Sequence, residues 1–118
     1  MKIYAIDDAS IFRTMYRSYL GADTYCTADG LLATMKMDRP DVLICDLVMP
    51  DMTGWEVIKR VQTMYPDLPI IVATTESEYV QREYAASQGC YFWYKGDSPS
   101  ILKHIVAEVS ECMQSKGK

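Results

Sequence analysis

Polar residues that can bind a cation or a phosphoryl group stand at the ends of four short apolar runs in the sequence. In chain order these residues are Asp7 and Asp8, Asp46, Thr74, and Lys95. If the runs are parallel strands, their ends meet at one edge of a sheet, where three carboxylates and one ammonium leave a net charge of −2. Two like charges 4 Å apart repel by about 4 kcal/mol at an effective dielectric constant near 20. A divalent cation would neutralise the group.

The carboxylates also indicate which cation and which chemistry to expect. Ligands that are all oxygen favour a hard ion, Mg²⁺ first and Mn²⁺ as the alternative. A carboxylate that a metal and a lysine keep ionised can attack phosphorus, and Asp46 is the candidate. Taken alone, Asp46 would more often be a helix cap or a turn former, and the pair Asp7-Asp8 likewise. A capping or turn-forming role for each acid does not explain why these polar residues stand at the equivalent ends of separate strands.

Short apolar segments alternate with amphipathic segments along the whole chain. Strands are expected at 2–6, 24–27, 41–46, 68–75 and 91–95, and helices at 10–20, 30–37, 54–65, 78–87 and from Ser98-Pro99 onward. Ser10 is expected to cap the first helix and Gly21 to end it, with Ile11, Phe12, Met15, Tyr16 and Tyr19 on one apolar stripe. Gly89 is expected to end the fourth helix. Five strand–helix units predict an α/β protein with a parallel sheet covered on both faces, and ligands at the carboxyl ends of its strands.

Composition limits the classes of function. The 118 residues fit one domain, and 49% of them are hydrophobic. A net charge of −4 without a Lys/Arg cluster argues against direct nucleic-acid binding. No apolar run is long enough to span a membrane, and the N-terminus does not read as a signal peptide.

Four cysteines are widely spaced along the chain: Cys26, Cys45, Cys90 and Cys112. No C-x-x-C pair is present, so reduced thiols and a cytoplasmic protein are expected. A zinc site is the alternative, with only His104 available to help, and His104 itself is expected at the surface of the last helix.

The sequence resembles the receiver domains of two-component response regulators over essentially its whole length. The motifs that carry the resemblance are "IDDAS", "DLVMPDMTG", "ATT" and "YFWYK", and they follow or close the first, third, fourth and fifth expected strands. The resemblance implies one receiver domain over residues 1–118. Its fold would be a flavodoxin-like (βα)5 doubly wound parallel sheet of strand order 2-1-3-4-5.

The resemblance also implies a role for each site residue. Asp46 would accept a phosphoryl group from a histidine kinase or a phosphotransfer protein. Asp8, Asp46 and the backbone carbonyl of Val48 would bind Mg²⁺, with Asp7 acting partly through water. Thr74 and Lys95 would each bind a phosphoryl oxygen, in keeping with phosphoryl transfer as a matter of positioning and charge neutralisation.

A switch is implied in which the movement of Thr74 is coupled to Phe92, three residues before Lys95. Two features depart from the family pattern: Gly96 replaces the proline usual after the lysine, and the segment 89–95 is one residue shorter. Gly96 would allow a looser loop. Thr75 replaces a small residue, and Val48 and Glu76 occupy positions that tune loss of the phosphoryl group.

The fifth strand is unusually aromatic. Packing against the flanking helices is one explanation. The other is a surface for a downstream protein or for a homodimer, formed by the fourth helix, the fifth strand and the fifth helix. On that hypothesis Trp93 anchors the partner, and Tyr79 and Tyr84 extend the patch.

The sequence therefore predicts a phosphorylation-dependent switch that signals by protein–protein contact. It is not expected to be an enzyme beyond promoting its own phosphorylation and dephosphorylation. Because the chain ends just after the fifth helix, a stand-alone receiver is expected, with a fragment of a longer regulator as the alternative. The rival functions are a phosphate-independent pseudo-receiver, a flavodoxin-like cofactor binder, and a haloacid dehalogenase-type phosphatase, which wants an Asp where Val48 stands.

Overall fold

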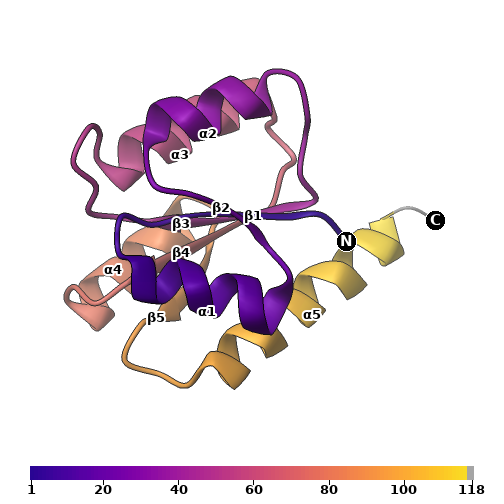
Figure 1. The fold of residues 1–118 in the computed structure, drawn as a ribbon. Helices are drawn as coiled ribbons and strands as arrows, with labels where there is room; N and C mark the ends of the chain where they lie inside the picture. The colour runs from indigo at the N-terminus through magenta and orange to yellow at the C-terminus, as the bar shows by residue number, and fades with distance from the viewer. Residues whose placement is uncertain (117–118) are drawn as a thin grey trace.

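Five parallel strands form one sheet in the order β2-β1-β3-β4-β5, which confirms the predicted fold class and strand order (Figure 1). The structure is a computed structural model that describes residues 1–116, and side chains up to residue 112. The strands are β1 (Ile3–Ile6), β2 (Asp23–Tyr25), β3 (Val42–Asp46), β4 (Ile70–Thr74) and β5 (Tyr91–Tyr94). The helices are α1 (Ser10–Leu20), α2 (Ala28–Met35), α3 (Gly54–Met64), α4 (Glu78–Ser87) and α5 (Pro99–Lys116).

The helices cover both faces of the sheet and divide the core into two layers (Figure 1). One layer contains buried residues of α2, α3 and α4, such as Leu31, Val57 and Ala85. The other contains buried residues of α1 and α5, such as Tyr16 and Leu102. Strands β1, β3 and β4 are buried along their whole length, as is usual when a parallel sheet is covered on both sides.

The boundary between β2 and α2 lies earlier in the chain than the sequence predicts. The strand ends at Tyr25, and Thr27, expected in the strand, is instead the N-cap of α2. Its hydroxyl accepts the N–H of Gly30 at 3.2 Å. A threonine suits either role, and the capping bond decides it.

The start of α1 also differs from the prediction. Ala9 is the N-cap residue and Ser10 is the first helical residue, so Ser10 does not cap the helix. The carboxylate of Asp7 accepts the Ala9 N–H at 2.9 Å and orders the turn before the helix. Gly21 ends α1 with a φ of 64°, as predicted. The apolar stripe is narrower than expected, because Ile11 is 75% exposed and Tyr19 is 53% exposed.

Trp93 is 1% exposed and packs in the core layer of α1 and α5. Its indole N–H donates to the Ser98 carbonyl at 3.3 Å, and its ring meets that of Phe12 edge to face, with centroids 6.5 Å apart. The hypothesis that Trp93 anchors a partner is therefore wrong, and packing explains this residue. Tyr79 and Tyr84 are exposed on α4.

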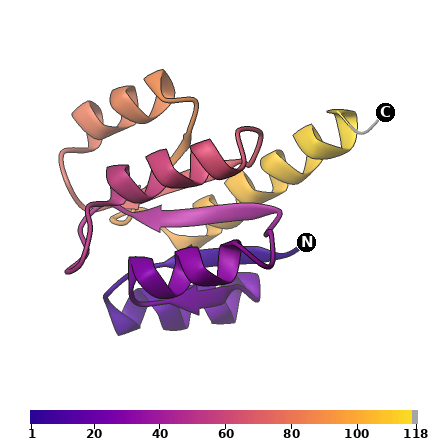
Figure 2. The same ribbon diagram turned by 90° about the horizontal axis from the view of Figure 1, so that it is seen from above.

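Helix α4 lies beside α3 (Figure 2), and Trp55 of α3 makes two contacts with it. The Trp55 indole N–H donates to the Gln81 side chain at 3.3 Å, and its ring lies 4.6 Å from that of Tyr84, edge to face. Ala85 is the buried residue of α4.

Within the described residues, no helix combines the length and apolar character needed to cross a bilayer. All four cysteines are free. Burial raises the pKa of the Cys90 thiol to about 11, and that of Cys45 further still. No cluster of cysteine and histidine that could hold zinc occurs in the described part of the chain, and His104 is exposed as expected.

Candidate functional site

Asp46 stands at the carboxyl end of the central strand β3 and is 5% exposed. The chain leaves it through the loop 47–53 and returns so closely that Gly54 packs against the Asp46 backbone. A Cβ on Gly54 would lie 2.2 Å from the Asp46 carbonyl oxygen, a distance that no side chain tolerates. The glycine of the motif "DLVMPDMTG" is thus required by this close approach.

The three acids of the first and third strands gather at one edge of the sheet, as the strand ends predict. Carboxylate oxygens of Asp7, Asp8 and Asp46 all lie within 4.8 Å of one another. Asp7 and Asp46 are buried, whereas Asp8 is exposed. An all-oxygen group that opens to solvent on one side fits a hard divalent cation that keeps several of its waters.

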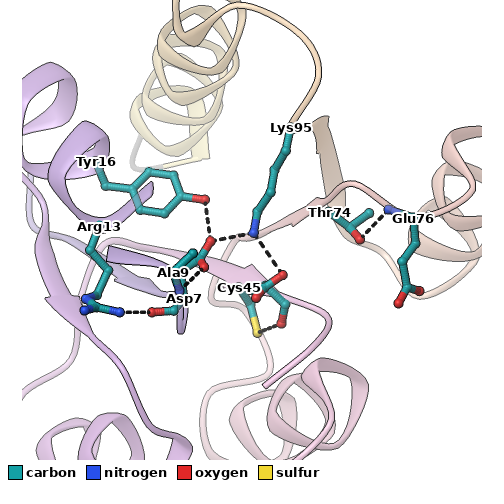
Figure 3. Close-up of polar contacts among 9 residues, drawn as sticks. Asp7, Ala9, Arg13, Tyr16, Cys45, Thr74, Glu76 and Lys95 are labelled. Atoms are coloured by element: carbon teal, nitrogen blue, oxygen red, sulfur yellow. Dashed lines mark hydrogen bonds and ion pairs between the residues drawn. The ribbon is translucent and has the colours of Figure 1, made fainter. Parts of the chain in front are cut away.

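Lys95 reaches into this acid group from the end of β5 (Figure 3). Its ammonium nitrogen lies 2.6 Å from Asp7 Oδ2 and 3.1 Å from Asp46 Oδ1, and its side chain is 6% exposed. The Lys95 backbone N–H donates to the Thr74 carbonyl at 2.9 Å, which fixes the start of the side chain. One buried ammonium therefore bridges two buried carboxylates.

Asp7 has the most partners in the site. In addition to Lys95 and the Ala9 amide, its Oδ2 accepts the Tyr16 hydroxyl at 3.4 Å, and its carbonyl oxygen accepts Arg13 Nη1 at 2.9 Å (Figure 3). Burial and the charge of Asp7 raise the pKa of Tyr16, which keeps it a hydroxyl donor. Asp7 is therefore a fixed element, and Asp8 and Asp46 are the freer carboxylates.

The charge in the site is not balanced. Burial raises the pKa of Asp46, and the neighbouring Asp7 carboxylate adds to that rise. The Lys95 ammonium and a hydrogen bond from the Val48 backbone act in the opposite direction, without compensating fully. An additional positive charge beside Asp46 would therefore favour its ionised form.

Thr74 and Phe92 lie on neighbouring strands in the layer covered by α4. Thr74 ends β4, is 1% exposed, and accepts the Glu76 N–H on its hydroxyl at 3.0 Å (Figure 3). Phe92 is buried opposite Val72, two residues before Thr74. The Arg82 guanidinium of α4 covers its ring at 4.8 Å from the centroid.

Several residues of the site were missed by the sequence analysis. Tyr16 and Phe12 were assigned only to an apolar stripe, and Arg13 and Asp51 were assigned no role. Asp51, in the loop after Asp46, accepts the N–H groups of Ala28 and Asp29 at 3.1 and 3.3 Å. It thereby ties that loop to the start of α2. Its partner Ala28 is 23 residues away in sequence, so local spacing does not indicate the contact. The direct metal role of the Val48 carbonyl stays a prediction.

Comparison with known proteins agrees with the fold. The family described as "Response regulator receiver domain" matches residues 3–93, so the chain belongs to this family. It is 34% identical to the DNA-binding transcriptional regulator NtrC of Salmonella typhimurium over 89 residues, which are 72% of this chain and 19% of that protein. It is also 34% identical to the response regulator MprA of Mycobacterium leprae over 114 residues, 92% of this chain and 49% of that protein.

Solved structures with the same fold include the chemotaxis protein CheY4 of Vibrio cholerae, at 29% identity and a TM-score of 0.82, covering 92% of this chain and 97% of that one. The beryllofluoride-activated receiver domain of DrrB has a TM-score of 0.84 at 22% identity, over 93% of this chain and 97% of that one, and supports the fold alone. The chain spans about a fifth of the length of NtrC and about half that of MprA.

Proposed function

We propose that this protein is a phosphorylation-dependent switch of a two-component phosphorelay, with Asp46 as the phosphoacceptor. The observation that carries the proposal is the Asp46 carboxylate, held 3.1 Å from the Lys95 ammonium at an edge where two further acids converge. The phosphoryl donor would be a phosphohistidine of a sensor kinase or of a phosphotransfer protein.

The residues present fit one divalent cation, Mg²⁺ or alternatively Mn²⁺. Asp8, Asp46 and the Val48 carbonyl would hold it directly, and Asp7 through water. When bound, the ion supplies positive charge to the phosphoryl oxygens. An Asp46 oxygen attacks phosphorus, forming a P–O bond as the P–N bond to histidine breaks and the histidine nitrogen takes the electron pair. Lys95 then pairs with a phosphoryl oxygen of the product.

The switch would use Thr74 and Phe92. In the present structure the Thr74 hydroxyl is engaged by the Glu76 amide. This contact leaves the hydroxyl proton free to donate. To reach a phosphoryl oxygen on Asp46 the side chain would turn toward Asp46, which would weaken the contact with Glu76. The turn would alter the β4–α4 connection and the space around Phe92, so phosphorylation would shift a two-state equilibrium at α4.

The signal would leave through the surface of α4, β5 and α5. This surface exposes Tyr79, Tyr84 and Ile101 and contains a groove of about 650 Å³ beside Phe92. We propose a downstream protein as its partner, with a homodimer as the alternative, rather than nucleic acid or membrane. The free cysteines favour a reducing compartment, the cytoplasm. No enzymatic role is proposed beyond control of the domain's own phosphorylation.

Intact-mass analysis after incubation with acetyl phosphate tests the function. A phosphate-sized gain in mass that requires Mg²⁺ is expected for the wild type and is expected to disappear in Asp46→Asn. Asp23→Asn, which removes an exposed acid on β2, is the matched control and should still be phosphorylated. No gain under any condition would contradict the proposal and leave a phosphate-independent pseudo-receiver.

A further inference from the structure

The side chain of Lys95 lies over an aromatic ring as well as beside two acids. Its ammonium nitrogen is 4.4 Å from the centroid of the Phe12 ring, on the first turn of α1. The face of an aromatic ring attracts a cation, and the attraction is stronger where water is excluded. With its side chain 6% exposed, Lys95 is in such a place.

Helix α1 also contacts Lys95 indirectly, because Tyr16 of this helix bonds to Asp7, which pairs with Lys95. Tyr16 follows Phe12 by four residues, so the two side chains project from one face of α1. The Tyr16 hydroxyl and the Lys95 ammonium both bond to Asp7 Oδ2, at 3.4 and 2.6 Å. Tyr16 is 0% exposed, so its hydroxyl has this carboxylate as its partner rather than bulk water.

Beneath Phe12 the support continues into β5 and the loop that follows Lys95. Trp93 packs edge to face on Phe12, and its indole N–H holds the Ser98 carbonyl. The residue after Lys95 is Gly96, which places no restriction of its own on the lysine backbone, unlike a proline. The aromatic side chains thus add to the two backbone bonds that hold this segment, from Lys95 N–H to the Thr74 carbonyl and from Asp97 N–H to the Tyr94 carbonyl.

We propose that Phe12 and Tyr16 are positioning residues for Lys95: Phe12 acts directly on the ammonium, and Tyr16 acts through Asp7. They keep the Lys95 ammonium beside Asp46 before any phosphoryl group arrives. Because the lysine side chain is already ordered, binding does not carry the entropy cost of ordering it. This inference deepens the proposed function and rests on it for its consequence, but the positioning itself is a property of the free protein.

The first experiment measures that property directly, by NMR of the full chain labelled with ¹⁵N and ¹³C lysine, without metal or phosphoryl donor. The Hε protons of Lys95 should be shifted upfield by the Phe12 ring current in the wild type. Phe12→Leu should return them to ordinary values, and Phe12→Tyr, which keeps a ring, should preserve the shift. Equal shifts in the wild type and Phe12→Leu would overturn the Phe12 assignment.

The second experiment measures binding by calorimetry, with Mg²⁺ alone and with Mg²⁺ plus beryllofluoride as the phosphoryl analogue. Phe12→Leu should weaken beryllofluoride binding about three- to tenfold and Phe12→Tyr less than about twofold, in line with the strength of a desolvated cation–π contact. Affinity for Mg²⁺ alone should change little, since Asp8 and Asp46 are untouched. An equal loss in Phe12→Leu and Phe12→Tyr would show a packing effect and contradict the proposal.

Tyr16→Phe removes only the hydroxyl. It keeps the proposal testable if a Phe12 variant fails to fold. It should keep the Lys95 ring-current shift and weaken beryllofluoride binding about two- to fivefold, because one hydrogen bond to Asp7 is lost. Wild-type affinity in Tyr16→Phe would overturn its part of the proposal. If the wild type bound no beryllofluoride, the proposed function would fail, while the NMR comparison would still decide whether Phe12 positions Lys95.

Discussion

On balance, the surroundings of Asp46 disfavour its ionised form. Burial and the Asp7 carboxylate both raise its pKa above the ordinary value for an aspartate. In the metal-free protein the folded state therefore favours the protonated carboxyl more than the unfolded chain does. At neutral pH, where the group is ionised in the unfolded chain, Asp46 lowers the free energy of unfolding, and this cost is absent below the unfolded pKa of about 3.9.

Replacing this carboxylate with its neutral isostere is therefore expected to stabilise the metal-free protein. Asp46→Asn should raise the Tm at pH 7.5 by about 2–5 °C in the presence of EDTA. The gain should shrink as the pH falls through the raised pKa of Asp46 in the folded state, because protonation of the wild-type carboxyl removes the cost. Lys95 keeps Asp7 as its partner in the variant. Thermal unfolding across this pH range measures the effect, with Asp23→Asn as control, and a lower Tm for Asp46→Asn at pH 7.5 would contradict it.

The polar residues at the strand ends could be predicted from the sequence because each follows an apolar run directly. Their partners in α1 could not. Helical spacing places Phe12 and Tyr16 on the same stripe as Ile11 and Tyr19. It does not indicate that the Tyr16 hydroxyl bonds to Asp7, or that Ile11 and Tyr19 remain exposed to solvent. The error at Ser10 has the same origin, since the Asp7 side chain orders the turn that a capping serine would have ordered.

The connection between β3 and α3 depends on the missing side chain of Gly54. Gly54→Ala should lower the free energy of unfolding by about 2–4 kcal/mol, since its Cβ would meet backbone atoms of Asp46 and Leu47 that cannot move independently. It should also lower affinity for Mg²⁺ by displacing Asp46. Chemical denaturation checks the first effect.

Gly30→Ala is the matched control for this substitution. Its Cβ would meet only the Thr27 hydroxyl, at 3.2 Å, and alanine favours a helix more than glycine does. A change of less than about 1 kcal/mol in either direction is expected there. Equal losses of stability in Gly54→Ala and Gly30→Ala would contradict the explanation that Gly54 is required by its close approach to the Asp46 backbone.

At the scale of elements, the long periodic segments were predicted to within a few residues, and the exceptions have physical causes. Thr27 suits a strand by shape and a helix start by its hydroxyl, so only the bond to Gly30 separates the two. The aromatic strand β5 was ambiguous for another reason. Its side chains alternate between two covered layers, Phe92 on the side of α4 and Trp93 on the side of α1 and α5, and sequence alone does not say which face is covered.

Over the whole molecule, the strand order came from the family resemblance and not from residue patterns. Alternating strands and helices specify a parallel sheet, but the direction in which each connection crosses depends on contacts between distant segments. The pairing of β1 with both β2 and β3 depends on such contacts between distant segments. The charge at the carboxyl edge, by contrast, follows from any order that brings β1, β3 and β5 to that edge.

If the proposed Mg²⁺ site forms, this concentration of charge should make the stability of the whole domain depend on divalent cations. At a Mg²⁺ concentration tenfold above its Kd, the free energy of unfolding should rise by about 1.4 kcal/mol. Asp8→Asn should lose most of that gain yet be no less stable in EDTA, because Asp8 is exposed. Unfolding curves at matched ionic strength with Na⁺ provide the control. A full Mg²⁺ gain in Asp8→Asn would exclude Asp8 as a ligand.

The two tryptophans divide the molecule in a way that has a practical consequence. Trp55 is half-buried where α3 meets α4, on the side of the sheet where Phe92 lies. Trp93 is buried in the opposite layer, where its ring contacts Phe12. The chain therefore contains two intrinsic fluorophores with different access to water, one on each side of the sheet. Time-resolved emission with an aqueous quencher separates their lifetimes, so rearrangement near α4 and disturbance beneath Lys95 become two distinguishable optical signals from one unlabelled sample.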